Sequence, residues 1–543
     1  MTAKLGEHAP TDKASCAGNS NLHQTVHCKG RIIPNARSDN IQCRHRRDKT
    51  SVGQPRTSQL ARRSPNRGLR RVPLAGTTAL QARCWPSKVR VSGSLLAHAP
   101  QMIARLLSTF SRKHANRYSI GAALALSMQI AGAALSLLVS FLLAKLIGAG
   151  DLGLYFLCVT STEIFSTISR LGLENAALKF ISIAHNSAEP ATVATVYRRC
   201  VGIAVLSAAV MILPAWVILN FAPIGTSQHD EFVSLMPFLM IALIPVTILS
   251  VQTESFKAIG RPGTAVFAQT VLPQSIILLL SVSLAWNGMA TIHSILASYA
   301  CAFLAAVILA FFRWKISIKH IWQKANFSTA VLLRTSLPIL IITSLTLVMA
   351  WTDTIVLGML STTDQVGIYG IALRISATAA FVLIAIGSVV APQFAALHAS
   401  GKHAELDVLV RRSSFWTLVI TSPLVLIFLA FPAQILGLFG EQFVGGAWSL
   451  RLLALSQLVN VSTGQVNSLL IMTGHEKLLR NNMMFSAALN LVGNVLMVPL
   501  FGSLGSAMST AFAISVMKII SWWIVRQKLR INTVDYLKLF LPT

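Results

Sequence analysis

The chain is 543 residues long, 54% of its residues are hydrophobic, only 12% are charged, and its mean hydropathy is +0.63. These values exclude an ordinary soluble protein, which needs a more polar surface, and indicate a chain that lies mostly in lipid. The formal net charge is +28, and residues 1–118 carry 22 of the 46 Lys and Arg residues but only 4 of the 18 acidic residues.

The N-terminal segment, residues 1–114, is rich in Arg, Ser, Pro, Gly and Gln and contains no long apolar run. Because it cannot bury enough apolar surface to offset the entropy cost of folding, we expect a basic, disordered extension. Alternatively, translation begins at Met102, which would leave a short basic leader before the first membrane helix. Basic runs such as "RRSPNRGLRR" can bind nucleic acid or anionic lipid, but a start at Met102 is the explanation that we favour, and we expect no nucleic-acid partner.

No metal or cofactor site is expected from the sequence. His23, His27 and Cys28 are close together, but no paired C-x-x-C spacing accompanies them. The chain also lacks a G-x-x-x-x-G-K-[ST] phosphate loop, so we do not expect it to hydrolyse ATP itself.

Apolar segments follow one another from residue 119 to the end of the chain. A bilayer core about 30 Å thick needs roughly 20 apolar residues of helix to cross it. Scanning with that length predicts twelve membrane-spanning helices, six in each half. Their expected bounds are 119–143, 152–170, 199–221, 234–257, 264–286, 291–312, 333–357, 366–390, 413–433, 447–472, 482–501 and 504–525.

The distribution of basic residues between the loops predicts the orientation. The loops 222–233, 287–290, 358–365 and 434–446 contain no Lys or Arg, whereas the basic clusters fall on the opposite side of the twelve-span scheme, with Lys145 as the exception. Loops rich in Lys and Arg stay in the cytoplasm. Both ends of the chain are therefore predicted to be cytoplasmic.

The two halves of the chain are related by a shift of 214 residues. Tyr155 in "GDLGLYF" precedes Tyr369 in "TDQVGIYG" by this number, and the same shift connects four further pairs. These pairs are Gly153 with Gly367, Phe180 with Phe394, Gly260 with Gly474, and Gly288 with Gly502. We infer a duplicated six-span unit. Because six is even, both copies cross in the same sense, and a two-fold axis along the membrane normal relates them.

The predicted fold is an all-α integral membrane protein with about twelve transmembrane helices in two six-helix lobes. A parallel pseudo-two-fold axis relates the lobes, and a cavity is expected between them. The domain limits that follow are 1–114 for the extension, 115–325 for the N-terminal lobe, 326–530 for the C-terminal lobe and 531–543 for a cytoplasmic tail.

Several stretches of the core, taken in order, resemble a known family. They are "SFLLAKLIGAGDLGLYFL", "SRLGLENAALKFIS", "AWTDTIVLGML", "VGIYGIALRI" and "GQVNSLLIMTGHEKLL". Over about residues 115–530 the chain resembles the polysaccharide transporter family of the multidrug/oligosaccharidyl-lipid/polysaccharide exporter superfamily. That family includes bacterial flippases for undecaprenyl-linked O-antigen and capsule units.

This resemblance implies a transporter and not an enzyme. The cargo would be a lipid-linked oligosaccharide, an undecaprenyl-diphosphate-linked repeat unit, flipped from the cytoplasmic to the outer face of the bacterial inner membrane for polysaccharide or lipopolysaccharide export. Alternating access coupled to H⁺ or Na⁺ would drive this step, with membrane lipid as the second partner. The alternative is a multidrug or cation antiporter of the same superfamily, whose cavity would be acidic.

A membrane-embedded glycosyltransferase or polymerase fits the sequence less well. Such enzymes usually need a sizeable outer loop with catalytic side chains. The longest outer loops here offer only His229, Asp230, Glu231 and Glu441, which we interpret as solvated loop residues.

Ionisable residues at membrane depth are costly and therefore mark candidate functional positions. Glu163 lies within the second span, Asp353 late in the seventh, and Arg374 within the eighth. Arg374 is the candidate for binding cargo diphosphate, because a planar guanidinium recognises phosphate oxygens in a bidentate manner. Glu163 or Asp353 would take up the coupling ion. A purely structural ion pair between Asp353 and Arg374 is favoured equally.

The second and eighth spans are equivalent in the repeat, so Glu163 and Arg374 are expected at similar depth, facing the cleft. Two further residues are weaker candidates. Gln129 is the polar residue that the first span offers to a cavity, and Arg170 could meet a diphosphate at the cytoplasmic end of the second span, although a membrane anchor is the more frequent role there. Lys518, in the last span, is expected to extend its ammonium group to the cytoplasmic surface.

Overall fold

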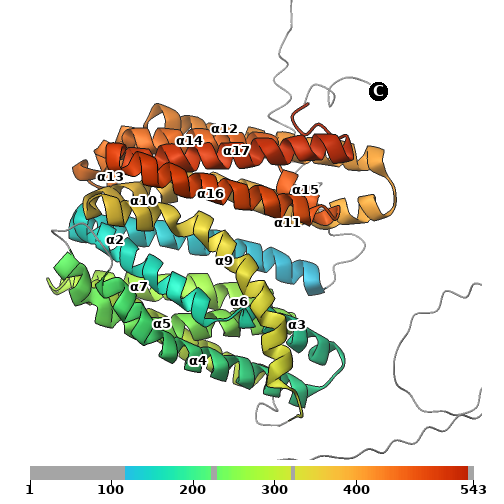
Figure 1. Ribbon diagram of the computed structural model, residues 1–543, viewed down its shortest axis with the longest axis horizontal. Coiled ribbons are helices and arrows are strands. Elements are labelled where there is room, and N and C mark those ends of the chain that lie inside the picture. The colour runs from blue at the N-terminus through green and yellow to red at the C-terminus, as the bar shows by residue number, and fades with distance from the viewer. Residues whose placement is uncertain (1–116, 222–228, 319–324, 536–543) are drawn as a thin grey trace, which may run out of the picture. The chain divides into compact units, whose positions relative to one another are not determined.

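The computed structural model describes residues 117–221, 229–318 and 325–535 (Figure 1). The predicted extension, residues 1–114, lies outside these ranges, as does the end of the predicted tail. Within the three ranges the chain forms helices joined by short turns and contains no strand. The predicted all-α class is confirmed.

The N-terminal lobe contains the first six predicted spans. α2 (Arg117–Ser169) holds two of them, because non-helical backbone angles at Gly148 (φ 78°, ψ −173°) divide it into two helical segments. α6, η1 and α7 follow one another without a break and form the fifth span. The remaining elements of this lobe are α3 (Leu173–Asn186), α4 (Pro190–Asn220), α5 (His229–Ala258), α6 (Pro262–Val266), the π-helix η1 (Phe267–Val271), α7 (Leu272–Trp286) and α8 (Ile292–Ser317).

The C-terminal lobe contains the other six spans, two of which are interrupted. The eighth span consists of α10 and α11, and the tenth consists of α14 and α15, with Gly464 (φ 69°, ψ −144°) at the break. The elements are α9 (Thr329–Leu360), α10 (Thr363–Ala377), α11 (Ala380–Ala399), α12 (His403–Ala430), α13 (Pro432–Phe439), the 3₁₀-helix η2 (Glu441–Gly446), α14 (Ala447–Thr463), α15 (Val466–Met472), α16 (Glu476–Phe501) and α17 (Ser503–Leu529).

The outer surface of the helices is apolar. In the three described ranges, nine helices are long and apolar enough to cross a membrane, and one of them, Leu124–Ser169, is long enough to cross twice. Their outward side chains include large apolar groups such as Trp286, which is 89% exposed, and Leu500, which is 71% exposed. Such a surface is stable in lipid and not in water. The chain is a multi-pass membrane protein.

The repeat appears in the structure as a reciprocal helix crossing between α2 and α10 (Figure 1). A β-carbon added at Gly153 would collide with the backbone oxygen of Thr363, and one added at Gly367 would collide with that of Ala149. These two contacts exchange under the 214-residue shift, which is the signature of an isologous contact about a two-fold axis. The two lobes therefore meet at the pseudo-two-fold axis, and glycine is needed at both positions because the backbones touch.

The largest apolar core is continuous across this crossing. It runs from Val139 and Leu143 of α2 through the tightly packed tyrosines Tyr155 and Tyr369 to Ala507 of α17. Burial of that cluster holds α2 and α10 together at the centre of the helical core. Side chains on the second segment of α2 and on α10 are therefore held at defined positions next to the axis.

Candidate functional site

A cavity of about 330 Å³ lies against this crossing and contains two of the candidate residues. Glu163 of α2 and Arg374 of α10 both line it. The other lining residues come from α2, α7, α8 and α9, so both halves of the repeat contribute. The structure thus brings together the acidic and the basic residue that the repeat placed on equivalent spans.

Arg374 is held by an aromatic ring. Its guanidinium carbon lies 3.7 Å from the centroid of the Phe156 ring, at cation–π distance. The Phe156 ring itself packs against Gly370, where a side chain would clash with it. In the described part of the chain, no carboxylate lies within ion-pair distance of Arg374. The guanidinium therefore keeps its hydrogen-bond donors available on the cavity side.

Glu163 shares the cavity without pairing with Arg374. It is half-buried, and no ion pair with it forms among the described residues. An acid and a base at membrane depth that line one cavity without contact can each bind a group of opposite charge. Both can act on the same cargo or ion.

Sequence reasoning did not single out the polar and aromatic residues that complete the cavity. Tyr155 and Tyr299 pack edge to face with ring centroids 6.3 Å apart, and Gln274 and Trp351 also line the cavity. The Trp351 indole N–H is buried without an acceptor in the described ranges. Aromatic faces and amide groups are typical of surfaces that bind sugars or amphipathic molecules. Tyr155 marked the repeat, but nothing in the sequence assigned it to a cavity.

Asp353 lies in a different environment, inside the C-terminal lobe. Asn490 donates a hydrogen bond to its Oδ1 at 3.0 Å, and Asn494 donates to the same atom at 2.7 Å. The Tyr369 hydroxyl donates to Oδ2 at 2.7 Å. The carboxylate is only 2% exposed. Three donors satisfy this buried carboxylate and fix α9 against α10 and α16.

The ion pair considered between Asp353 and Arg374 is not formed. Trp351 lines the cavity, and Asp353, two residues further along α9, points to the opposite side of the helix because two residues rotate by about 200°. The sequence placed Asp353 late in the seventh span, but the helix face determined its partners. The network also contains one unmatched acceptor, since Asn490 Oδ1 is buried with no donor in the described ranges.

The two weaker candidates lie away from the cavity. Gln129 is exposed on α2 and is not among the cavity-lining residues. Arg170 forms an ion pair with Glu174 at 3.1 Å and donates to the Ser250 hydroxyl at 2.7 Å. Burial raises the pKa of Glu174, and the positive charge of Arg170 opposes that shift. Arg170 therefore belongs to a network at the end of α2 that links it to α3 and α5.

Lys518 is buried and not extended along the surface. Its side chain is only 6% exposed and lines a second cavity of about 390 Å³ in the C-terminal lobe. Polar groups from α11, from the break between α14 and α15 and from α15 line this cavity, including Ser388, Gln465 and Asn467. No ion pair with Lys518 occurs within the described ranges. Irregular backbone at membrane depth is tolerated where it lines such a cavity.

Known proteins match this chain in sequence. Residues 120–398 match the family model described as polysaccharide biosynthesis protein. A probable low-salt glycan biosynthesis flippase of Haloferax volcanii is 27% identical over 171 residues, which are 31% of this chain and 36% of that protein. An uncharacterized membrane protein of Methanocaldococcus jannaschii is 21% identical over 418 residues, which are 73% of this chain and 82% of that protein. The chain thus spans about a third of the first relative and most of the second.

Solved structures match it in fold. An inward-facing multidrug resistance MATE family transporter of the MOP superfamily superposes with a TM-score of 0.60 at 14% identity, covering 79% of this chain and 98% of that one. A MOP superfamily transporter of Pyrococcus furiosus, for which a reverse polarity of the binding pocket is described, gives a TM-score of 0.55 at 12% identity and covers 76% and 95%. Similarity at these identities establishes the two-lobed fold alone.

Proposed function

This chain belongs to the polysaccharide biosynthesis protein family and is a multi-pass membrane transporter, and from that premise we propose that it flips a lipid-linked oligosaccharide for polysaccharide export. The cargo is an undecaprenyl-diphosphate-linked repeat unit that moves from the cytoplasmic to the outer face of the bacterial inner membrane. Both ends of the chain then lie in the cytoplasm, in keeping with the basic loops. The observation that carries the proposal is the unpaired Arg374 guanidinium in the cavity beside the two-fold axis.

Arg374 has the chemistry that a diphosphate group requires. Its planar guanidinium offers donors in a fixed fork, and the ring of Phe156 holds one face of that plane. A diphosphate that enters the cavity replaces the hydration of the guanidinium with charged hydrogen bonds. The aromatic and amide groups of Tyr155, Tyr299 and Gln274 then surround the attached sugar.

The buried ammonium of Lys518 supports an anionic cargo. It lines its own cavity together with amide and hydroxyl groups, and no acidic residue is among the residues that line that cavity. A buried cation without a protein partner is costly unless a ligand or water compensates it. An anionic group of the cargo supplies that compensation in one state of the transport cycle.

Asp353 is the group that we assign to ion coupling. Its carboxylate, the unmatched Asn490 Oδ1 and the Thr510 hydroxyl bring oxygen atoms together in a buried position. Oxygen ligands suit a hard cation such as Na⁺, and a buried carboxylate also suits a proton. Uptake or release of that ion changes the charge inside the C-terminal lobe and favours one orientation of the transporter over the other.

The central test is export of the lipid-linked oligosaccharide by purified protein in proteoliposomes. Arg374→Ala should abolish transport, and Arg374→Lys should reduce it by about tenfold or more, because a charged hydrogen bond is worth about 1.5–3 kcal/mol. Arg451→Lys is the matched control. Arg451 also stacks on an aromatic ring, 4.8 Å from Trp448, but lines none of the cavities described above. Full transport by Arg374→Ala at matched protein level would remove Arg374 from the binding site.

The coupling ion is tested by imposing a Na⁺ or a pH gradient on the same proteoliposomes. Wild-type transport should rise with one of the two gradients, and Asp353→Asn should lose that response while cargo still binds. Asp364→Asn, at an exposed position on α10, serves as the control. If Asp353→Asn keeps the response and Glu163→Gln loses it, the coupling group is Glu163.

A multidrug or cation antiporter is the second candidate, and Glu163 favours it. An acidic side chain without an ion pair in the described part of the cavity can bind an organic cation directly. The proteoliposome assay distinguishes the two functions. Export of a cationic dye that depends on Glu163, without transport of the lipid-linked oligosaccharide, would establish the antiporter.

A further inference from the structure

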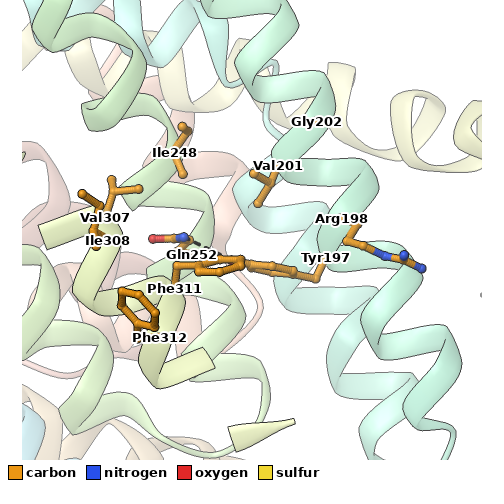
Figure 2. A pocket seen from close by; sticks show the side chains of 10 residues that line it. All are labelled: Tyr197, Arg198, Val201, Gly202, Ile248, Gln252, Val307, Ile308, Phe311 and Phe312. Carbon is orange, nitrogen blue, oxygen red and sulfur yellow. Dashed lines mark hydrogen bonds between the residues drawn. The ribbon is translucent and has the colours of Figure 1, made fainter. Parts of the chain in front are cut away.

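A third cavity, of about 450 Å³, forms a groove between α4, α5 and α8 in the N-terminal lobe (Figure 2). Apolar side chains make up most of its lining. Three of them, Ile308, Phe311 and Phe312 of α8, are 46%, 38% and 55% exposed. None of the residues that line the groove also lines the cavity that holds Arg374. Exposed apolar side chains on membrane-spanning helices suit contact with lipid.

A polar side chain, the amide of Gln252, lies at the bottom of the groove and is held there by a hydrogen bond. The Gln252 amide nitrogen donates to the Tyr197 hydroxyl at 3.1 Å, and the Tyr197 ring stacks on Trp314 with centroids 4.3 Å apart. Gln252 is only 1% exposed, and its Oε1 has no donor in the described ranges. Figure 2 shows the amide oxygen turned away from Tyr197, toward Val307 and Ile308. An acceptor held in place without a donor indicates a ligand that brings one.

Two residues that shape the groove, Gly202 and Gln252, are not repeated in the C-terminal lobe. At Gly202 of α4, nothing lies within 4 Å of an added β-carbon, so this glycine leaves the groove open. The residue 214 positions later is Trp416, and the counterpart of Gln252 is Val466, which is fully buried. The second copy of the unit therefore carries a large side chain and an apolar residue where the first has space and an amide.

Basic residues indicate at which end of the helices the groove lies. Arg198 of α4 lines it, and the last turns of α5 and α8 carry Lys257 and Lys315. The groove thus lies toward the basic ends of these helices. Anionic phospholipids concentrate in the cytoplasmic leaflet and are attracted to basic residues at that level.

We propose that this groove binds one anionic phospholipid of that leaflet. An acyl chain lies along Val201, Ile308 and Phe311, the phosphate meets Arg198, and a headgroup hydroxyl donates to Gln252 Oε1. Phosphatidylglycerol carries both the negative charge and the hydroxyl donors. The bound lipid is a resident of the N-terminal lobe and is not the transported cargo, so this site goes beyond the proposed function.

Native mass spectrometry of the purified full-length protein tests the proposal. Phosphatidylglycerol, phosphatidylethanolamine and undecaprenyl diphosphate are added at equal concentration. Wild type should retain one phosphatidylglycerol. Gly202→Trp, which introduces the residue of the second lobe, should abolish that retention, and Arg198→Gln should weaken it about fivefold. Ala209→Trp, also at an exposed position on α4, should change nothing.

Three results would overturn the proposal. They are equal retention of phosphatidylglycerol by Gly202→Trp, equal retention of phosphatidylethanolamine by wild type, and one-for-one displacement of phosphatidylglycerol by undecaprenyl diphosphate. If Gly202→Trp fails to fold, Gln252→Leu and Arg198→Gln decide, and unchanged retention by both would reject the site. Because the measurement requires no transport, its failure is distinguishable from failure of the proposed function.

Discussion

The two lobes carry opposite chemistry at equivalent positions. In the C-terminal lobe a buried polar network is formed by Asp353, Tyr369, Asn490, Asn494 and Thr510. The residues 214 positions earlier are Val139, Tyr155, Ile276, Leu280 and Leu296. Only the tyrosine is shared. In the C-terminal lobe it donates to Asp353, and in the N-terminal lobe it lines the cavity with Arg374 and Glu163.

This difference shows which positions must be the same in both copies of the repeated unit and which can differ. The crossing of α2 and α10 needs glycine in both copies, because each backbone contacts the other. Other side chains on these helices are not constrained in this way. The buried network around Asp353 lies within the C-terminal lobe, whereas the cavity with Glu163 and Arg374 is lined from both lobes. Under the function proposed above, the network around Asp353 would bind the coupling ion and the cavity at the crossing would bind the cargo.

The largest expected effect tests the shared part of this comparison. Gly153→Leu and Gly367→Leu should each abolish folded protein, because overpacking at a backbone contact costs more than about 3 kcal/mol. Since the contact is reciprocal, the two substitutions should be equally severe. The measurement is the fraction of monodisperse protein after detergent extraction. Gly202→Leu, at a position with open space, is the control and should fold normally. Normal folding of one of the two variants would show that the crossing is not symmetric.

Most of the fold could be predicted from the sequence, because hydropathy marks each span and the constant shift marks the repeat. The interruptions of the eighth and tenth spans could not. α10 ends at Ala377 within the stretch "RISATAAFVL", which contains no Gly or Pro to mark the break. The break at Gly464 depends on tertiary contact, since a β-carbon there would collide with the hydroxyl of Ser414 on α12.

The candidate site was predicted in part. Glu163 and Arg374 were found because a charge at membrane depth is rare, and the structure places both at one cavity. Asp353 was found for the same reason, but its partners were not, because depth along a helix does not fix the face to which a side chain points. Asn490 and Asn494, four residues apart in an apolar span, carried a readable signal that two amides share one helix face.

The smallest expected effect concerns the tyrosine that the two lobes share. Tyr369→Phe removes one of three donors from the Asp353 carboxylate, and the remaining two must hold a buried group that is 2% exposed. Tyr155→Phe removes a hydroxyl from a residue that lines the cavity. Unlike the Tyr369 hydroxyl, the Tyr155 hydroxyl donates no hydrogen bond to a carboxylate within the described ranges. The same chemical change is therefore made in two different surroundings.

We expect Tyr369→Phe to lower the free energy of unfolding in detergent by about 1–2 kcal/mol, because hydrogen bonds inside membrane proteins are worth this much at most and the acceptor here is a carboxylate. Tyr155→Phe should change it by less than about 0.5 kcal/mol, since no buried partner loses a donor. The two variants should also differ in their effects on transport. Tyr369→Phe should alter the ion dependence through Asp353, whereas Tyr155→Phe should alter the apparent affinity for cargo and leave the ion dependence unchanged. Equal losses of stability in the two variants would mean that the two tyrosine hydroxyls make equivalent buried contacts in the two lobes.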